Sequence, residues 1–360
     1  MHQGEQRDGV VTGLRADDVD DFARGTALLG CGGGGQVDHM AHALRRALGD
    51  ARVPVVPVGG GVRAVMAVGL VGSTTVLEEK TPSGRELPDA LAAVERWTGR
   101  RADAVVAAQI GGVTGPAAAL TAHAVGLPLV DADLVGRATP RIDQLSLFVG
   151  SSPSVTAAAV TSSGLRIVVD SSDPRDLETV WREAVSHSGG WAAFAVGPVD
   201  AEVLAARCIT GSVDRALRTG RVAAAAAGVE DLVVGLDGAR AVARGRVLDV
   251  QRGGDAVAFV HGSMAIRDAA TGAVVRVEAG SEWVHCLVDG EPVASTPSCI
   301  VVVDARSLRP VSTERARVGD ELAVLVLPGA PWWWASPERT ARVAPRAFGI
   351  DADAVPEAAA

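Results

Sequence analysis

The sequence predicts an α/β N-terminal domain, with a mixed or parallel sheet covered by helices, followed by a β-rich C-terminal domain. Two patterns in the 360 residues predict this. In the first half, apolar β-branched runs alternate with helical segments, as in sheets whose strands are joined by crossover helices. In the second half, short β runs follow one another at the spacing of an antiparallel barrel or sandwich. The length fits about two domains.

The first half opens with a helix, a glycine turn and a second helix. Asp17 or Asp18 can cap the first helix, and the second covers residues 37–48. Between them lies the run Gly30-Cys31-Gly32-Gly33-Gly34-Gly35. The elements that follow are predicted as strands at residues 53–58 and 62–71, a helix at 88–97, a strand at 104–110, a helix at 116–124 and a strand at 127–130.

The second half starts with a strand at residues 165–169 and amphipathic helices at 174–184 and 212–219. The β runs after these helices cover residues 241–251, 256–261, 274–279, 283–288, 300–303 and 321–327. We therefore expect a flexible N-terminus over residues 1–16 and an α/β domain over residues 17–165. The C-terminal domain is expected over residues 166–356, helical at first and then β-rich.

Composition excludes several classes of protein. A net charge of −9 without a Lys/Arg cluster disfavours nucleic-acid binding. The polar first residues argue against a signal peptide, and no apolar run approaches the roughly 18 residues that would span a bilayer. The four cysteines are far apart and form no CxxC pair, so neither a disulfide framework nor a zinc ribbon is indicated. We expect a cytoplasmic protein.

The glycine run is the first candidate site. Its spacing matches the dinucleotide fingerprint, but no strand precedes it and no acid ends the next strand. Glycines ahead of a helix can present N–H groups to an anion or a developing oxyanion, or they can simply form a tight turn. Cys31 in this loop is either a nucleophile activated by the helix N-terminus or a packing residue.

Polar residues at the ends of two predicted strands form the second candidate site. Asp131 and Asp133 follow an apolar strand, at the sheet edge where α/β proteins gather ligands. The pair could act as a general base, bind a divalent cation or hold a substrate N–H, or it could be a helix cap and a loop carboxylate. Gln109 ends the preceding strand at the same edge. Lys80, the only lysine, is a candidate clamp on a carbonyl or a partner of Glu78 and Glu79.

Three consecutive tryptophans, Trp332 to Trp334, follow Pro331 in a chain with seven Trp and no Tyr. Such a cluster packs a domain or subunit interface, or forms the wall of a pocket. We favour the interface. The histidines are scattered and form no metal-binding spacing.

Six blocks of the sequence carry a family resemblance. They are Leu29-Gly30-Cys31-Gly32-Gly33-Gly34-Gly35, Glu79-Lys80-Thr81-Pro82-Ser83-Gly84, Gln109-Ile110-Gly111-Gly112, Val130-Asp131-Ala132-Asp133, Gly136-Arg137-Ala138-Thr139-Pro140 and Pro345-Arg346-Ala347-Phe348-Gly349. In this order, over residues 17–356, they resemble the DUF917 family, also called S-methyl thiohydantoin desulfurase-like and related to the hydantoinases and oxoprolinases. The chain differs from the family pattern at Cys31, where Thr is usual, and at Gln109, where Glu is usual, which leaves room for a different substrate.

The resemblance implies attack on the amidine-like carbon of an S-methylated thiohydantoin, with release of methanethiol. We therefore hypothesise a hydrolase or desulfurase acting on a small cyclic amide, imide or amidine. In this hypothesis Asp131 or Asp133 handles the proton, Lys80 and Gln109 orient or polarise the carbonyl, and Cys31 is a nucleophile or a bystander. The residues assigned to substrate binding are Gly32, Gly33, Gly34, Gly35, Gly111, Gly112, Arg137 and Glu282.

Two other functions compete with this hypothesis. One is a non-catalytic accessory subunit of a hydantoinase or oxoprolinase system, binding its partner through the Trp cluster. The other is a divalent-metal hydrolase that uses Asp131 and Asp133. We otherwise expect no cofactor, a small-molecule substrate, neither nucleic acid nor membrane as partner, and a homo-oligomer. The leading hypothesis requires Lys80, Gln109 and Asp131 to share one cavity.

Overall fold

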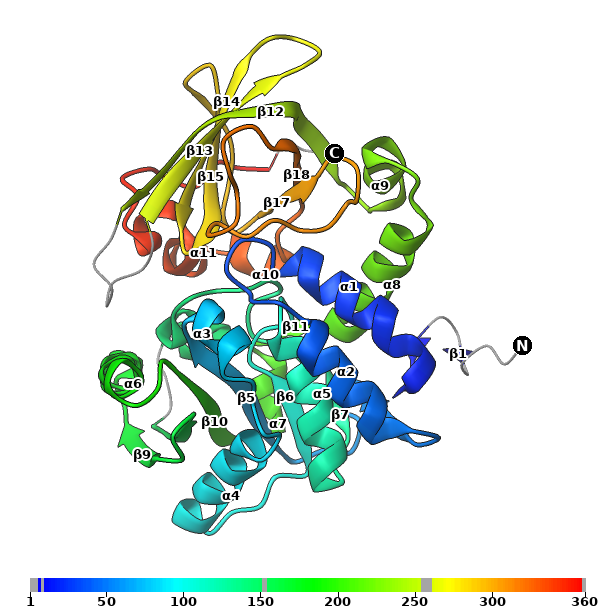
Figure 1. Ribbon diagram of the computed structural model, residues 1–360. Coiled ribbons are helices and arrows are strands. Elements are labelled where there is room, and N and C mark those ends of the chain that lie inside the picture. Colours follow the sequence, from blue (N-terminus) through cyan, green and yellow to red (C-terminus); the bar gives the residue numbers. More distant parts are fainter. Residues whose placement is uncertain (1–5, 8–9, 151–153, 254–260, 358–360) are drawn as a thin grey trace.

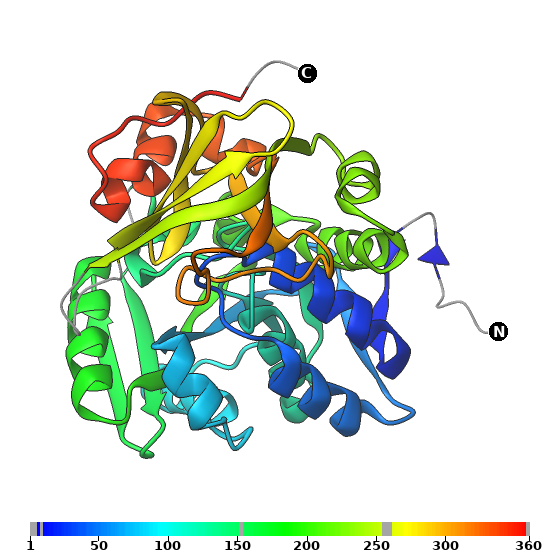
Figure 2. The same ribbon diagram turned by 45° about the horizontal axis from the view of Figure 1, so that its top comes forward.

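The computed structural model describes residues 6–7, 10–150, 154–253 and 261–357. Within these residues a nine-stranded mixed sheet and a seven-stranded antiparallel sheet organise the chain. The antiparallel sheet, drawn in yellow to orange, is stacked above the helix-covered mixed sheet in both views (Figure 1, Figure 2). The predicted fold class, an α/β region followed by a β-rich region, is confirmed.

The mixed sheet has the strand order β3-β4-β7-β6-β5-β10-β8-β9, with β11 paired to β7. Its strands are β3 (Gly13–Arg15), β4 (Arg52–Val56), β5 (Ala64–Gly72), β6 (Ala104–Ala107), β7 (Leu129–Asp133), β8 (Val155–Thr161), β9 (Arg166–Ser171), β10 (Trp191–Asp200) and β11 (Ile209–Thr210). The neighbours β4, β7, β6 and β5 run parallel. The carboxyl ends of these strands therefore meet at one edge, and β9, β10 and β11 return to this sheet after residue 165.

The N-terminus is part of this arrangement. Gly13–Arg15, which we expected to be flexible, forms β3 because its backbone pairs with β4. Ahead of it, β1 (Gln6–Arg7) and β2 (Val10–Val11) pair with each other. Residues 1–5 and 8–9 of the predicted flexible segment lie outside the described residues.

Helices cover both faces of the mixed sheet. They are α1 (Val19–Leu29), α2 (Asp38–Leu48), α3 (Thr74–Glu79), α4 (Glu86–Thr98), α5 (Thr114–Val125), α6 (Pro174–His187), α7 (Ala201–Ala205), α8 (Ser212–Ala225) and α9 (Val229–Gly235), with the 3-10 turns η1 (Ala16–Asp18), η2 (Ile142–Gln144) and η3 (Ser146–Phe148). Met66 and Val68 of β5 pack into the core with α1, α2, α4 and α5. Val65 and Ala67 face the other core, against α6, because successive side chains of a strand point to opposite faces.

The antiparallel sheet has the order β16-β15-β14-β13-β12-β18-β17. Its strands are β12 (Arg240–Gly253), β13 (His261–Asp268), β14 (Val274–Gly280), β15 (Glu282–Val288), β16 (Glu291–Ser295), β17 (Cys299–Asp304) and β18 (Glu321–Leu327). Its inner face continues the core that contains α1 and α2. Most of the β run predicted at residues 256–261 lies outside the described residues.

The C-terminal helices join the two regions. They are α10 (Pro331–Trp334), α11 (Pro337–Val343) and the 3-10 turn η4 (Pro345–Phe348). Trp333 is buried, and its indole N–H donates to the carbonyl of Val135 at 2.7 Å. Trp332 donates to Ala206 O at 3.3 Å. The Trp cluster therefore packs an interface inside the chain, as favoured from the sequence. In the part of the chain described, no helix has the length and apolarity needed to cross a membrane.

Candidate functional site

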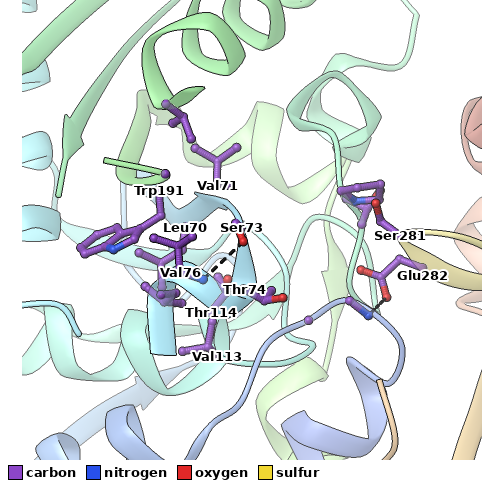
Figure 3. Close-up of a pocket in the computed structure, with 18 of the residues that line it drawn as sticks. Leu70, Val71, Ser73, Thr74, Val76, Val113, Thr114, Trp191, Ser281 and Glu282 are labelled. Carbon is purple, nitrogen blue, oxygen red and sulfur yellow. Dashed lines mark hydrogen bonds between the residues drawn. The ribbon is translucent and has the colours of Figure 1, made fainter. Parts of the chain in front are cut away.

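A cavity of about 490 Å³ lies where the carboxyl ends of the parallel strands face the β14–β15 connection. Its lining comes from the end of β5, from Gln109 after β6, from Thr139 after β7, and from Ser281 and Glu282 of the antiparallel sheet. Figure 3 shows Ser281 and Glu282 on one side and the β5 and α3 side chains on the other. The volume is in the range of small-molecule sites, about 300–1,000 Å³.

Glu282 is the buried acidic residue in the lining of this cavity. It is 2% exposed, and its Oε2 accepts a hydrogen bond from the backbone N–H of Gly33 at 2.8 Å. The residue before it, Ser281, has a φ of 68°, a conformation that non-glycine residues seldom adopt and that often marks functional sites. The tight turn at Ser281 brings Glu282 from the antiparallel sheet to the glycine loop of the α/β region.

The environment of Glu282 suits proton transfer. Burial raises the pKa of its carboxyl from 4.5 to about 7, although the positive charge of Arg137 and the Gly33 N–H oppose the rise. A carboxyl with a pKa near neutrality is present in both protonation states at physiological pH, as a general acid or base requires.

Arg137 is the buried cation associated with this acid. Its side chain is 6% exposed, and the guanidinium lies 5.8 Å from the centre of the Phe348 ring. Among the described residues, its Nη1 has no hydrogen-bond partner. Arg137 does not line the cavity, so what the structure shows is the effect of its charge on Glu282, and the predicted contact with substrate stays a prediction.

Gln109 is the predicted catalytic residue that does line the cavity. Its Oε1 accepts a hydrogen bond from Thr139 N at 2.7 Å, and its Nε2 lies 3.5 Å from Thr114 Oγ1. Because a backbone N–H can only donate, the first bond fixes the orientation of the amide. The Nε2 end is held more loosely and is therefore the end suited to donate to a bound carbonyl.

The glycine loop interlocks with the turn after β6. A Cβ at Gly30 would lie 2.0 Å from Gly112 N, and one at Gly112 would lie 1.9 Å from Gly34 O. Gly112 N donates to Thr26 O and Val113 N donates to Gly34 O. Only residues without a Cβ allow backbones to approach this closely.

The loop supports Glu282 rather than offering free donors. A Cβ at Gly33 would lie 2.7 Å from Glu282 Oε1. The N–H groups of Gly33 and Gly34 donate to Glu282 and to Gly30 O, so the oxyanion role predicted for them lacks available donors. The other predicted glycines lie behind the cavity lining: Gly32 and Gly35 border a second cavity of about 550 Å³, and Gly111 packs against the Arg137 backbone.

Asp133 is an internal structural carboxylate. It is fully buried. Its Oδ2 accepts from the backbone N–H groups of Ile110, Val135 and Gly136, at 2.7 to 3.2 Å. Its Oδ1 accepts from Ser212 Oγ at 2.6 Å, and burial raises its pKa to about 6. Asp133 holds together the loops after β6 and β7, and it does not line the cavity.

Asp131 caps α8. Its Oδ1 accepts from Val213 N at 2.8 Å and from Asp214 N at 3.3 Å, which satisfies N–H groups of the first turn. Burial raises its pKa. Across the described residues, no group of three or more His, Cys, Asp or Glu could hold a metal ion. Asp131 and Asp133 as ligands of a divalent metal therefore stay a prediction.

Lys80 and Cys31 also lie outside the cavity lining. Lys80 is exposed at the end of α3, with its Nζ 3.5 Å from Gly189 O. Cys31 is 5% exposed, and its Sγ donates to Val302 O and accepts from Val302 N, both at 3.2 Å. Burial raises the pKa of this thiol, which disfavours the nucleophilic thiolate. The predicted convergence of Lys80, Gln109 and Asp131 is not found, because only Gln109 reaches the cavity.

The sequence interpretation assigned Glu282 to substrate binding and missed its capacity for proton transfer. The available signal was one acid at the start of the β run predicted at residues 283–288, directly after a Gly-Ser turn. Thr114 and Thr139 were missed as well: Thr139 stands in one of the six family blocks, which was the available signal, whereas nothing in the local sequence marks Thr114.

Family models and one solved structure place this geometry among known proteins. The model described as S-Me-THD-like, N-terminal domain, matches residues 17–171, and S-Me-THD-like, C-terminal domain, matches residues 171–357. Among curated proteins, none matches this chain. The X-ray structure of a Chromobacterium violaceum protein, a structural-genomics target, is similar with a TM-score of 0.73 and 19% identity over 94% of this chain and 97% of that chain. It supports the fold. The chain belongs to the S-Me-THD-like family.

Proposed function

We propose that this protein is an enzyme that hydrolyses or desulfurises a small cyclic amide, imide or amidine, with Glu282 as its proton-transferring group. One observation carries the proposal: a buried carboxyl with a pKa of about 7 forms part of the wall of a 490 Å³ cavity. Membership of the S-Me-THD-like family supports a thiohydantoin-like ring as the substrate.

For an S-methyl thiohydantoin, Glu282 would assist the addition of water across the ring C=N bond. The carboxylate takes one proton from water as the oxygen bonds to the ring carbon, and passes that proton to the ring nitrogen. The C–S bond then breaks as the new hydroxyl becomes a carbonyl. The hydroxyl proton passes through Glu282 to the departing methanethiolate, so the products are the hydantoin and methanethiol.

Two neighbouring groups give Glu282 this role in the proposal. Gly33 N–H holds one carboxylate oxygen at 2.8 Å and fixes its direction, while Arg137 keeps the ionised form accessible. Gln109 Nε2 is placed to donate to a ring carbonyl. We assign no proton transfer to Asp131 and Asp133, because their carboxylate oxygens accept hydrogen bonds from the first turn of α8 and from the loops after β6 and β7.

The test is release of methanethiol from an S-methyl thiohydantoin by purified protein, followed with a chromogenic thiol reagent. Glu282→Gln keeps the shape of the side chain but cannot take a proton, and we expect it to lower kcat by about 10²- to 10⁴-fold. The matched control is Glu291→Gln, the same change at an exposed position of β16 in the same sheet. Wild-type turnover by Glu282→Gln, or no turnover of any S-methyl thiohydantoin or hydantoin by the wild type, would overturn the proposal.

We also propose that the enzyme works in the reducing cytoplasm. All four cysteines, Cys31, Cys208, Cys286 and Cys299, are free and buried. Proteins of oxidising compartments more often pair their cysteines in disulfides, so four unpaired thiols support a cytoplasmic location.

A further inference from the structure

We infer that the ring substrate carries an apolar substituent, aliphatic or aromatic, that binds against the side of the cavity opposite Glu282. This inference rests on the proposed function, because it assumes that the reacting ring lies beside Glu282. The surface that carries it, here called the apolar wall, consists of Leu70, Val71, Val76, Val113, Val185 and Trp191.

The apolar wall is built by five separate parts of the α/β region, one of which is Val113 at the N-cap of α5. Leu70 and Val71 end β5, Val76 is on α3, Val185 is on α6, and Trp191 begins β10. Figure 3 shows the side chains from β5, α3 and β10 together on one side of the cavity, across from Ser281 and Glu282. A ligand that touches Glu282 and extends away from it therefore meets this wall.

Two members of the wall leave apolar surface uncovered. Leu70 and Val76 are only half-buried, whereas Val71 and Val185 beside them are 8% and 5% exposed. A hydrogen bond holds the Trp191 ring in place, because its indole N–H donates to Lys80 O at 2.8 Å. A ligand group placed here would remove the remaining surface of Leu70 and Val76 from water, which is favourable for an apolar group.

The cavity is larger than the ring alone requires. An unsubstituted hydantoin has seven heavy atoms, far fewer than the drug-sized ligands that cavities of about 300–1,000 Å³ enclose. The cavity holds about 490 Å³. The ring beside Glu282 thus leaves room for a side chain directed at the apolar wall.

The charges that line the cavity argue against an anionic substituent. Arg182 also lines the cavity, but its Nε and Nη2 donate to Glu178 Oε1 at 3.0 and 2.7 Å, and Nη2 also donates to Pro140 O. Glu178 therefore compensates the charge of Arg182. The other charged lining residues are Glu282 and Glu314, and both would repel a ligand carboxylate when ionised.

The test compares the dissociation constants of hydantoin, 5-isobutylhydantoin and 5-(2-carboxyethyl)hydantoin with the wild-type protein, by calorimetry. Burial of a methylene is worth about fourfold in affinity, so we expect the isobutyl ligand to bind about 10- to 100-fold more tightly than hydantoin. Val76→Thr keeps the shape of the side chain and adds a hydroxyl, and it should reduce this preference about fourfold. Val234→Thr, at a position that is 87% exposed on α9, is the control and should not change it.

Binding and turnover separate this inference from the proposed function. A preference for the isobutyl ligand that Val76→Thr weakens would support the apolar substituent, whether or not the S-methyl thiohydantoins are turned over. Methanethiol release without such a preference would overturn the inference and leave the proposed function standing. Tightest binding of the carboxyethyl ligand, or no binding of any of the three, would also overturn it.

Discussion

Gly33 N–H and Glu282 Oε2 form a 2.8 Å hydrogen bond between residues 249 positions apart. The glycine loop of the α/β region thereby holds an acid that the antiparallel sheet supplies. A Cβ at Gly33 would occupy the space of this carboxylate, so the loop and the acid fit each other only when residue 33 is glycine. The candidate site is therefore complete only when the two regions of the chain are packed together.

The pH dependence of turnover should follow Glu282. Its pKa of about 7 means that the carboxylate, the form able to accept a proton, is depleted as the pH falls below 7. We expect kcat/KM for an S-methyl thiohydantoin to rise about tenfold per pH unit below pH 7 and to level off above it. The residual kcat/KM of Glu282→Gln should not rise with pH below pH 7. If kcat/KM of the variant rises with pH as it does in the wild type, the titrating group is another residue.

The stability of the fold should depend on the same group. Because the folded-state pKa is raised from 4.5 to about 7, the folded protein retains the proton over a pH range in which the unfolded chain releases it. The contribution of Glu282 to stability is thus intact below pH 4.5 and is lost as the pH rises through 7. At about 1.4 kcal/mol per pKa unit, the loss is about 3 kcal/mol.

Denaturant unfolding of wild type and Glu282→Gln between pH 4 and pH 8 measures this effect. The difference in unfolding free energy, variant minus wild type, should increase by about 3 kcal/mol from the low to the high end of the range. Other titrating groups are common to both proteins and cancel in the difference. A difference that stays constant with pH would mean that Glu282 has a similar pKa in the folded and unfolded states.

The sequence was sufficient for the fold class because that information is local. Continuous apolar runs mark β5 and β18, and the Ala-rich run after Pro116 marks α5, without reference to the rest of the chain. The site depends on contacts between distant segments. Asp131 and Asp133 do stand at the end of a strand, as predicted, but the N–H groups and hydroxyl that engage them come partly from α8, about 80 residues later. An Asp that follows an apolar strand has the same local sequence whether it caps a helix or acts as a catalytic base.

Asp133 tests this distinction directly. In Asp133→Asn, the amide oxygen can still accept from the three backbone N–H groups. The amide nitrogen can donate to Ser212 Oγ, whose own proton has Ile209 O as an acceptor at 2.9 Å. We expect near wild-type stability and turnover for this variant. Asp133→Ala leaves the N–H groups buried without a partner, which should cost about 3 kcal/mol or more of unfolding free energy. A folded Asp133→Asn protein without turnover would instead make Asp133 part of the catalytic machinery.

Cys31 should be dispensable for turnover. Its thiol is buried and bonded to both backbone groups of Val302, and Ser can make the same two bonds through its hydroxyl. We expect Cys31→Ser to retain kcat within a few-fold. In the native wild-type protein a thiol reagent should label none of the four buried cysteines at the rate of a free thiol, and it should label all four in denaturant. Loss of turnover in a stable Cys31→Ser protein would revive the covalent mechanism.

The packing of α1 on α8 depends on two glycines. A Cβ at Gly25 would lie 1.7 Å from Ala216 O, and one at Gly220 would lie 1.7 Å from Asp21 O. In an isolated helix, Gly→Ala stabilises by about 1 kcal/mol. Here the clash is with backbone atoms that no rotamer change can move, and overpacking of this kind costs about 1–3 kcal/mol or more, so the clash outweighs the helix propensity.

We therefore expect Gly25→Ala and Gly220→Ala each to lower the thermal midpoint by several degrees. Gly253→Ala, where a Cβ would meet no atom of the described residues within 4 Å, is the control and should leave the midpoint unchanged. The double variant should lose less than the sum of the single changes, because the first clash already separates the helices that the second would separate. An unchanged or raised midpoint in either single variant would show that α1 and α8 are packed less closely than the structure has them.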